Sequence, residues 1–231
     1  MKLILNPKYE HLRDYLTHLE EHFEKEGQEI HRGRNIIRTL KVGGLTLCVK
    51  RYQQPTLKRW LQQMTYKSPK SKLAYLSPLL LRERGFESPE SIAYVRFRHG
   101  FKAFTDYFVC LLSEYRYSMD SLSERPEAEQ EEIIASFASY VAHLHEGGFM
   151  HRDFAPSNIL FDKIGDRYHF SLVDTNSMKC CKPVNIEAGC RNLAQLSGDD
   201  RFFNTLIRIY ASERHFNVER CMSLVNEARQ R

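Results

Sequence analysis

The stretch that decides the fold class is HRDFAPSNILF at residues 151–161, followed after a turn by YHFSLVDTN at residues 168–176. The first segment holds Asp153 and Asn158 in a polar loop that ends in the apolar residues 159–161. The second segment is typical of a strand and contains Asp174 near its end. The pattern therefore predicts oxygen-bearing side chains in a loop and at a strand end, anchored by apolar residues in a folded core.

Phosphoryl transfer explains both the types and the spacing of these side chains. One carboxylate must orient the attacking hydroxyl and accept its proton, while an amide oxygen and a second carboxylate hold Mg²⁺ against the nucleotide phosphates. Asp153 has the chemistry of the first group, and Asn158 and Asp174 have the chemistry of the other two. His151 is more suited to bracing the loop than to proton transfer, because the aspartate has the acid-base role in this chemistry.

The loop matches the kinase pattern H-R-D-x-x-x-x-N, and VDTN falls where protein kinases carry D-F-G. The whole arrangement resembles the lipopolysaccharide core kinase family, whose members phosphorylate Kdo or heptose sugars. The resemblance runs from about Asn35 to the C-terminus and is strongest at residues 151–176. It implies an α+β, two-lobed protein-kinase-like fold with a β-rich N-lobe and a mainly helical C-lobe. It also implies ATP and Mg²⁺ as cofactors, with Asn158 and Asp174 as the metal ligands.

Apolar periodicity along the chain predicts the elements of these lobes. We expect a helix over 8–26, a hairpin over 35–52 that turns at Gly43-Gly44, and strands over 91–98 and 106–115. A long helix over 127–146 and a helical segment from about 191 to 231 follow. The predicted domains are an N-lobe at 1–113 and a C-lobe at 114–231.

Lys50 is the expected nucleotide lysine. It lies in LTLCVKRY, the second strand of the predicted hairpin, and resembles the β3 lysine with which kinases hold the α- and β-phosphates. The alternative is an ordinary solvated strand lysine. No GxGxxG precedes it, so the phosphates would be covered by the hairpin backbone near Gly43-Gly44 or by cationic side chains.

The glutamate that kinases pair with this lysine is also missing. In SKLAYLSP (71–78) the corresponding position holds Leu76. Because Pro is favoured at the first helical position, Pro78 predicts a short helix over 78–84, which leaves Glu83 or Glu87 as imperfect substitutes. Asn176 is not followed by the arginine that the resemblance predicts.

The distribution of charged, cysteine and apolar residues limits the kinds of partner that the protein can bind. The chain has a formal net charge of +5, and the stretch between Glu29 and Glu83 contains twelve Lys/Arg and no acidic residue. Such a stretch favours binding to phosphates or to an anionic membrane surface. The alternative is that these side chains form an ordinary solvent-exposed face without a binding role. The six cysteines lack zinc spacing and predict reduced, mostly buried thiols. No apolar run reaches the roughly 20 residues of a membrane span.

The sequence therefore favours transfer of the ATP γ-phosphate to a sugar hydroxyl of the lipopolysaccharide inner core. We expect a lipid-linked acceptor, a cytoplasmic protein with peripheral contact at the inner-membrane face, and no nucleic acid. The alternatives are a small-molecule kinase for an aminoglycoside or choline-type alcohol, for which Asp120 and the glutamates at 124–132 could form an acidic pocket, and a nucleotide-binding pseudokinase.

Overall fold

The computed structural model describes residues 1–53, 69–100, 103–180 and 182–230. The chain forms two compact units. Unit 1 comprises Met1–Leu80 and Pro89–Ser113, and unit 2 comprises Leu81–Ser88 and Glu114–Arg231. The segment Leu81–Ser88 belongs to unit 2 and forms hydrogen bonds with a strand there: the Ser88 hydroxyl donates to the carbonyl of Leu172 at 2.7 Å.

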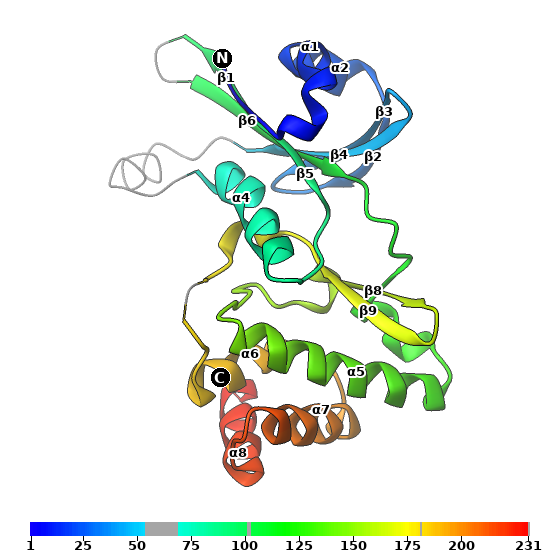
Figure 1. Cartoon of the computed structure of the whole chain (residues 1–231), viewed down its shortest axis with the longest axis vertical. Helices are drawn as coiled ribbons and strands as arrows, with labels where there is room; N and C mark the ends of the chain where they lie inside the picture. Colours follow the sequence, from blue (N-terminus) through cyan, green and yellow to red (C-terminus); the bar gives the residue numbers. More distant parts are fainter. Residues whose placement is uncertain (54–68, 101–102, 181, 231) are drawn as a thin grey trace. The chain divides into compact units, whose positions relative to one another are not determined.

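Unit 1 is built on an antiparallel sheet with the strand order β1-β5-β6-β4-β3-β2 (Figure 1). Its strands are β1 (Lys2–Leu5), β2 (Gln28–Arg32), β3 (Ile36–Val42), β4 (Leu45–Tyr52), β5 (Ser91–His99) and β6 (Ala103–Leu111). The predicted hairpin is confirmed: β3 and β4 pair in register around Gly43 and Gly44, whose φ angles of 57° and 78° suit a tight turn. The last predicted strand, 106–115, lies instead at Ala103–Leu111.

Three short helical pieces cover one face of this sheet (Figure 1). They are η1 (Pro7–Leu12), α1 (Arg13–Thr17) and α2 (Leu19–Lys25), in place of the single helix predicted over 8–26. The break at His18, with φ −107° and ψ 17°, falls between α1 and α2. Both pieces still bury their apolar side, since Leu16 and Phe23 pack in one cluster with Leu47 and Val49 of β4.

The helix α4 (Lys70–Glu83) begins well before Pro78, so the predicted short helix over 78–84 is wrong. Its first turn is fixed by a buried contact in which the Ser71 hydroxyl donates to Asp106 Oδ2 at 2.9 Å. Asp106 also accepts two hydrogen bonds from the Arg96 guanidinium, at 2.6 and 2.7 Å. An interior proline removes one backbone hydrogen bond and clashes with the carbonyl four residues earlier, whereas this anchor and the burial of Tyr75 stabilise the turns of the helix that precede Pro78.

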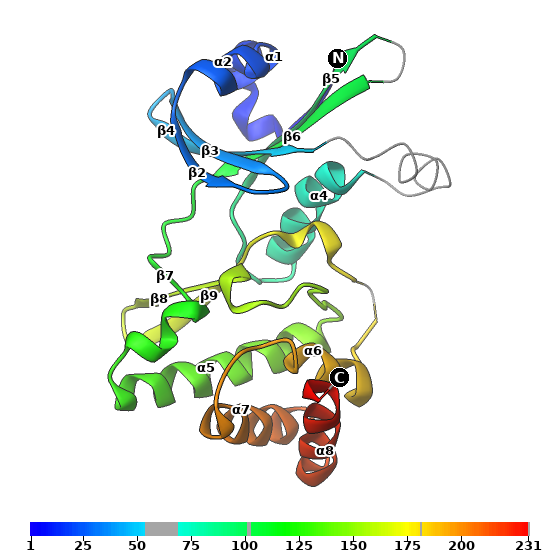
Figure 2. The ribbon, with the colours of Figure 1, turned by 180° about the vertical axis from the view of Figure 1, so that it is seen from behind.

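Unit 2 has a long helix at its centre, α5 (Glu127–Glu146), and both predicted ends of this helix are confirmed. Figures 1 and 2 show α5 between a small sheet on one side and α7 on the other. Phe137, fully buried on α5, has its ring 5.3 Å from that of Phe170 and 6.0 Å from that of Phe154 (centroid to centroid). The remaining elements are β7 (Tyr117–Ser118), η2 (Met119–Glu124), η3 (Pro156–Asn158), β8 (Ile159–Ile164), β9 (Arg167–Leu172), η4 (Thr175–Ser177), α6 (Ile186–Leu193), α7 (Asp200–Glu213) and α8 (Val218–Arg229).

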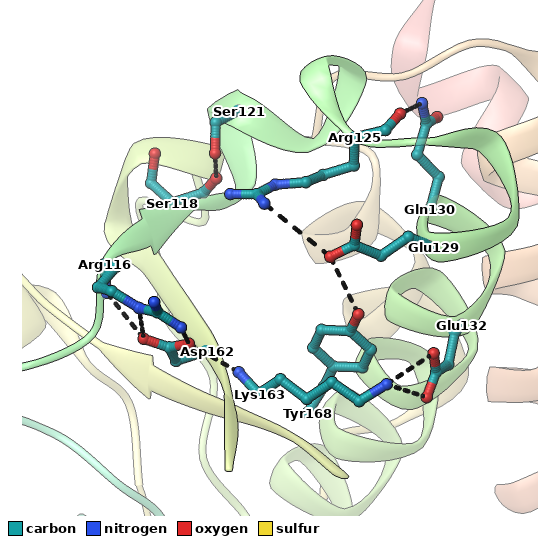
Figure 3. Close-up of polar contacts among 10 residues, drawn as sticks. All are labelled: Arg116, Ser118, Ser121, Arg125, Glu129, Gln130, Glu132, Asp162, Lys163 and Tyr168. Atoms are coloured by element: carbon teal, nitrogen blue, oxygen red, sulfur yellow. Dashed lines mark hydrogen bonds and ion pairs between the residues drawn. The ribbon is translucent and has the colours of Figure 1, made fainter. Parts of the chain in front are cut away.

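Polar contacts bind this small sheet, in the order β7-β8-β9, to the start of α5 (Figure 3). Lys163 of β8 pairs with Glu132 at 3.1 Å, and the Tyr168 hydroxyl of β9 donates to Glu129 at 3.1 Å. Arg116 meets Asp162 through two guanidinium hydrogen bonds of 2.8 and 2.6 Å. The segment that precedes β7 is thereby held on β8, the strand that follows residues 151–158.

Candidate active site

The loop HRDFAPSN lies between α5 and β8, and its first residue is a fully buried histidine. His151 Nδ1 accepts a hydrogen bond from the Asp153 amide at 3.2 Å, so Nε2 carries the proton that is donated to the Val173 carbonyl at 3.0 Å. Burial lowers the pKa of His151, which favours this neutral form. The histidine braces the loop against the strand end, as the sequence predicted.

Asn158 closes the other end of the loop. Its side-chain amide donates to the Asp153 carbonyl at 2.9 Å, and its own carbonyl accepts from the Val173 amide at 3.0 Å. This orientation leaves the side-chain oxygen of Asn158 as an acceptor for a cation. The Asp153 side chain is exposed, as a group that must meet a substrate hydroxyl requires.

Asp174 directly follows Val173, to which both ends of the loop are bonded. Its backbone is left-handed, with φ 53° and ψ 41°, a conformation that few residues other than glycine adopt and that aspartate tolerates. The side-chain amide of Asn176 donates to the Asp174 carboxylate. Unit 2 thus brings together three of the four predicted site residues, Asp153, Asn158 and Asp174.

The fourth, Lys50, lies in unit 1. It is at the predicted place on β4, between Ile37 of β3 and Phe108 of β6, and its Nζ lies 5.4 Å from the centroid of the Tyr52 ring. Glu83 is the one acidic residue of α4, a helix that the structure describes in full, and it is exposed in the last turn.

Glu87, the other substitute for the missing glutamate, is engaged within unit 2. It accepts hydrogen bonds from the Tyr115 hydroxyl and from His169 Nδ1, the latter at 3.1 Å. Leu76 itself has an exposed fraction of 36%. The glutamate of the kinase pattern therefore has no equivalent in the described part of α4 before Glu83.

The donor set suits a magnesium ion that is held jointly with a nucleotide. Among the described residues there is no group of three or more His, Cys, Asp or Glu side chains that could hold a metal by themselves. Mg²⁺ is commonly bound by one or two carboxylates together with phosphate and water oxygens. Asn158 and Asp174 are such a pair, so these residues fit the ion that the kinase pattern implies. Of the five described cysteines, Cys110, Cys190 and Cys221 are buried.

Two residues that sequence analysis missed hold the loop from α6 and the turn after it. The Asn192 side-chain amide donates to the His151 carbonyl at 2.7 Å, and the Gln195 side-chain oxygen accepts from the Phe154 amide at 2.9 Å. The sequence predicted only that Asn192 and Gln195 belong to a helical segment from about 191 to 231. A polar residue within an amphipathic helix carries no local signal that it is buried against a loop some 40 positions earlier.

A groove of about 390 Å³ in unit 2 borders the catalytic loop at Pro156. Its polar lining includes Asp120 of η2, Glu131 of α5, and Asp199 and Arg201 at the start of α7. Arg201 pairs with Glu131, whereas Asp120 makes no ion pair with any described residue. Carboxylates therefore exceed cations in this groove.

Ion pairs neutralise part of the positive charge of the basic stretch between Glu29 and Glu83. Arg51 pairs with Glu24, and Arg32 pairs with Glu29, both acids lying before the stretch. Arg34, Lys41, Lys70 and Lys72 make no ion pair with the residues that the structure describes. Lys58, Arg59 and Lys67 lie outside the described residues. No described helix is long and apolar enough to cross a membrane.

Comparison with known proteins identifies the family of the chain. The model of the lipopolysaccharide kinase (Kdo/WaaP) family matches residues 79–207, more than half of the chain and all of the loop and strand end described above. The structure titled "WaaP in complex with acyl carrier protein" has a TM-score of 0.66 at 14% identity, over 100% of this chain and 98% of that one.

Two further structures share the fold. The bifunctional kinase-methyltransferase WbdD has a TM-score of 0.52 at 17% identity, over 85% of this chain and 43% of that one. A microcompartment-associated aminopropanol kinase has a TM-score of 0.55 at 11% identity, over 93% of this chain and 86% of that one. The predicted α+β, protein-kinase-like fold is confirmed.

Proposed function

The chain belongs to the lipopolysaccharide kinase (Kdo/WaaP) family and is a kinase, and on this basis we propose that it transfers the γ-phosphate of ATP to a sugar hydroxyl of the lipopolysaccharide inner core. The observation that carries the proposal is the hydrogen-bonded cluster in unit 2. His151 and Asn158 both form hydrogen bonds with Val173, and these bonds join the loop that carries Asp153 and Asn158 to the strand end that carries Asp174.

Each residue has one role in the proposed reaction. Asp153 orients the acceptor hydroxyl and takes its proton as the phosphoryl group is transferred. Asn158 and Asp174 would hold Mg²⁺, which supplies positive charge against the nucleotide phosphates when it is bound. Lys50 would hold the α- and β-phosphates, as the strand position implies. His151 keeps the loop in shape without exchanging protons with the substrate.

The proposed acceptor is a lipid-linked core sugar, reached by peripheral contact with an anionic membrane surface from the cytoplasmic side. The cationic side chains of unit 1 without a described ion pair support this contact, at about 1 kcal/mol for each Lys or Arg close to the lipid. Activity on a lipid-linked acceptor should then fall as salt is added. Turnover that is insensitive to salt would contradict this use of the basic residues.

The test is transfer of labelled γ-phosphate from Mg-ATP to Kdo-lipid, heptosylated core, aminoglycoside, amino alcohol and generic protein acceptors. Asp153→Asn should lower turnover by at least about 10²-fold while Mg-ATP still binds, because general base catalysis is worth that much. Asp166→Asn, in the exposed β8–β9 turn, is the matched control and should be fully active. Wild-type transfer to a core sugar, lost in Asp153→Asn, supports the proposal; equal turnover in both would refute the role of Asp153.

The acidic groove supports a second candidate, a kinase for a small cationic alcohol. Asp120, Glu131 and Asp199 line a cavity that borders the catalytic loop, and carboxylates of this kind bind ammonium groups. In the same assay, transfer to the amino alcohol or aminoglycoside alone would favour this candidate. Asp120→Asn should then raise KM for the cationic acceptor and leave KM for ATP unchanged. Mg-ATP binding without transfer to any acceptor would instead support a pseudokinase.

A further inference from the structure

Three polar side chains from three different helices form a buried chain behind the catalytic loop. His145 of α5, Asn192 of α6 and Tyr210 of α7 are exposed by 0%, 2% and 0% respectively. His145 lies 2.9 Å from the Tyr210 hydroxyl through Nδ1 and 3.1 Å from Asn192 Oδ1 through Nε2. Asn192 Nδ2 then donates to the carbonyl of His151 at 2.7 Å. The chain therefore ends on the backbone of the loop.

The hydrogen bonds in this chain can run in one direction only. Because Asn192 donates to a carbonyl through its nitrogen, its oxygen must accept from His145 Nε2. His145 Nδ1 is then an acceptor, and the Tyr210 hydroxyl donates a hydrogen bond to it. Burial lowers the pKa of His145 to about 4, so the ring stays neutral and keeps this order at neutral pH. Each donor in the chain fixes the orientation of the next side chain.

The surrounding backbone is shaped around these contacts. Gly189 of α6 faces Tyr210, and a Cβ at this position would lie 2.2 Å from the Tyr210 hydroxyl oxygen and 3.4 Å from His145 Nδ1. Arg214 completes the far end, since it donates to the Tyr210 hydroxyl at 3.4 Å and to the Val184 carbonyl at 2.7 Å. The absence of a side chain at Gly189 leaves the room that the tyrosine and the histidine need.

The end of α6 and the turn after it hold the loop at two points that flank Asp153. Asn192 binds the carbonyl of His151, and Gln195, three residues later, binds the amide of Phe154. A loop without regular structure has backbone groups that must find partners elsewhere, and these two side chains supply them. Only Arg152 and Asp153 lie between the two points, so the hydrogen bonds from Asn192 and Gln195 constrain the backbone of Asp153 on both sides.

We propose that Asn192, oriented by His145 and Tyr210 and assisted by Gln195, is a positioning residue that holds the backbone of the catalytic loop where Asp153 can meet the acceptor. This inference rests on the proposed function. Misplacement of a catalytic group by about 1 Å costs on the order of 10²-fold in rate, so a single lost donor behind the loop should have a large kinetic effect.

The central test compares Asn192→Asp with the wild type. The aspartate has the shape of the asparagine and can still accept from His145, but it cannot donate to the His151 carbonyl. We expect kcat to fall by at least about tenfold while KM for Mg-ATP changes by less than about twofold. Peptide-level hydrogen exchange should show faster exchange over residues 151–158 and unchanged exchange in α8.

Two substitutions of His145 distinguish positioning from packing. His145→Gln can still donate to Asn192 and should keep most of the activity and most of the loop protection. His145→Leu fills a similar volume without a donor, so Asn192 can turn away, and its effects should approach those of Asn192→Asp. Val225→Ala, in the buried part of α8, is the control for a loss of stability alone and should leave kcat and exchange at 151–158 unchanged.

The outcomes are distinct. Wild-type kcat and wild-type exchange over 151–158 in Asn192→Asp would overturn the inference, as would an equal kinetic loss in Val225→Ala. If Asn192→Asp does not fold, Tyr210→Phe removes one oxygen at the far end of the chain and should change both measurements in the same direction; no change in either would overturn the inference. If the wild type transfers no phosphate, the proposed function fails, whereas hydrogen exchange still decides whether α6 holds the loop.

Discussion

Replacing Asp162 with asparagine tests how the β8–β9 hairpin beside the catalytic loop is held. Asp162 accepts both guanidinium hydrogen bonds from Arg116 and further bonds from the amides of Arg116 and Lys163, at 3.3 and 2.9 Å. The hydrogen bonds from Arg116 lower the pKa of Asp162 from 3.8 to about 2. The carboxylate is therefore stabilised in the folded protein relative to the unfolded chain.

The size of the effect follows from this shift. At 1.36 kcal/mol per unit of pKa, the shift corresponds to at most about 2 kcal/mol of folding free energy. The Asp162 side chain is 12% exposed, but that of Arg116 is 65% exposed, and solvent screening of the guanidinium reduces the expected loss in Asp162→Asn to about 1–2 kcal/mol.

The pH dependence has a definite sign. A carboxyl group whose folded-state pKa is depressed stabilises the protein fully above its unfolded pKa and loses this contribution as pH falls through the folded value. The free-energy gap between wild type and Asp162→Asn should be constant between about pH 7 and 5, decrease below about pH 4 and vanish near pH 2.

Urea unfolding followed by far-UV circular dichroism at several pH values measures this gap. Asp166→Asn, in the exposed turn of the same hairpin, is the matched control and should change the free energy of unfolding by less than about 0.5 kcal/mol. The reasoning is refuted if Asp162→Asn is as stable as the wild type at pH 7, if the control loses as much, or if the gap widens as the pH falls.

Three other substitutions should also change stability by amounts that thermal or urea unfolding can measure. Phe137→Ala should cost about 3–5 kcal/mol and lower activity, because it removes a fully buried ring that packs against Phe154 of the catalytic loop; a loss below about 1 kcal/mol would contradict this packing. Asp106→Asn should cost about 3 kcal/mol, since it leaves the Arg96 guanidinium without its carboxylate and releases Ser71 at the start of α4; Asp120→Asn, an exposed carboxylate, is its control. Gly148→Ala should be more destabilising than Gly165→Ala: both glycines have positive φ, 84° and 61°, but only at Gly148 would a Cβ lie 3.0 Å from the backbone of Lys182, and equal losses would show that this contact is unimportant.

The sequence predicted those parts of the fold that depend on local patterns. The apolar face of α5 and its ending at Gly147-Gly148 determine that helix at both ends, and Gly43-Gly44 determines the β3–β4 hairpin. The proximity of Asp153, Asn158 and Asp174 followed from the kinase loop pattern, and their roles remain a prediction. The two lobes expected at 1–113 and 114–231 also remain a prediction about domains.

Errors occurred where a local rule competed with distant contacts. Pro78 predicts the start of a helix, yet it lies inside α4. The hydrogen bond between Ser71 and Asp106 stabilises the turns of that helix that precede it. The apolar spacing over 8–26 is continuous, but the helix is interrupted at His18. With this interruption, Leu16 and Phe23 both pack against the sheet. In both cases burial decided between conformations that the local sequence allows about equally.

The residues behind the catalytic loop show why a site can be recognised from the sequence while the residues that hold its backbone in place cannot. The loop pattern is local, because Asp153 and Asn158 must stand at a fixed separation to act on the same phosphoryl group. Its backbone partners need only supply one donor or acceptor at one place, and any polar side chain that the fold brings there can do so. Asn192 and Gln195 meet this need from about 40 residues further along the chain, through contacts that only folding creates. A test of the site that changes Asp153 alone therefore measures the chemistry, and a test that changes Asn192 measures the geometry on which that chemistry depends.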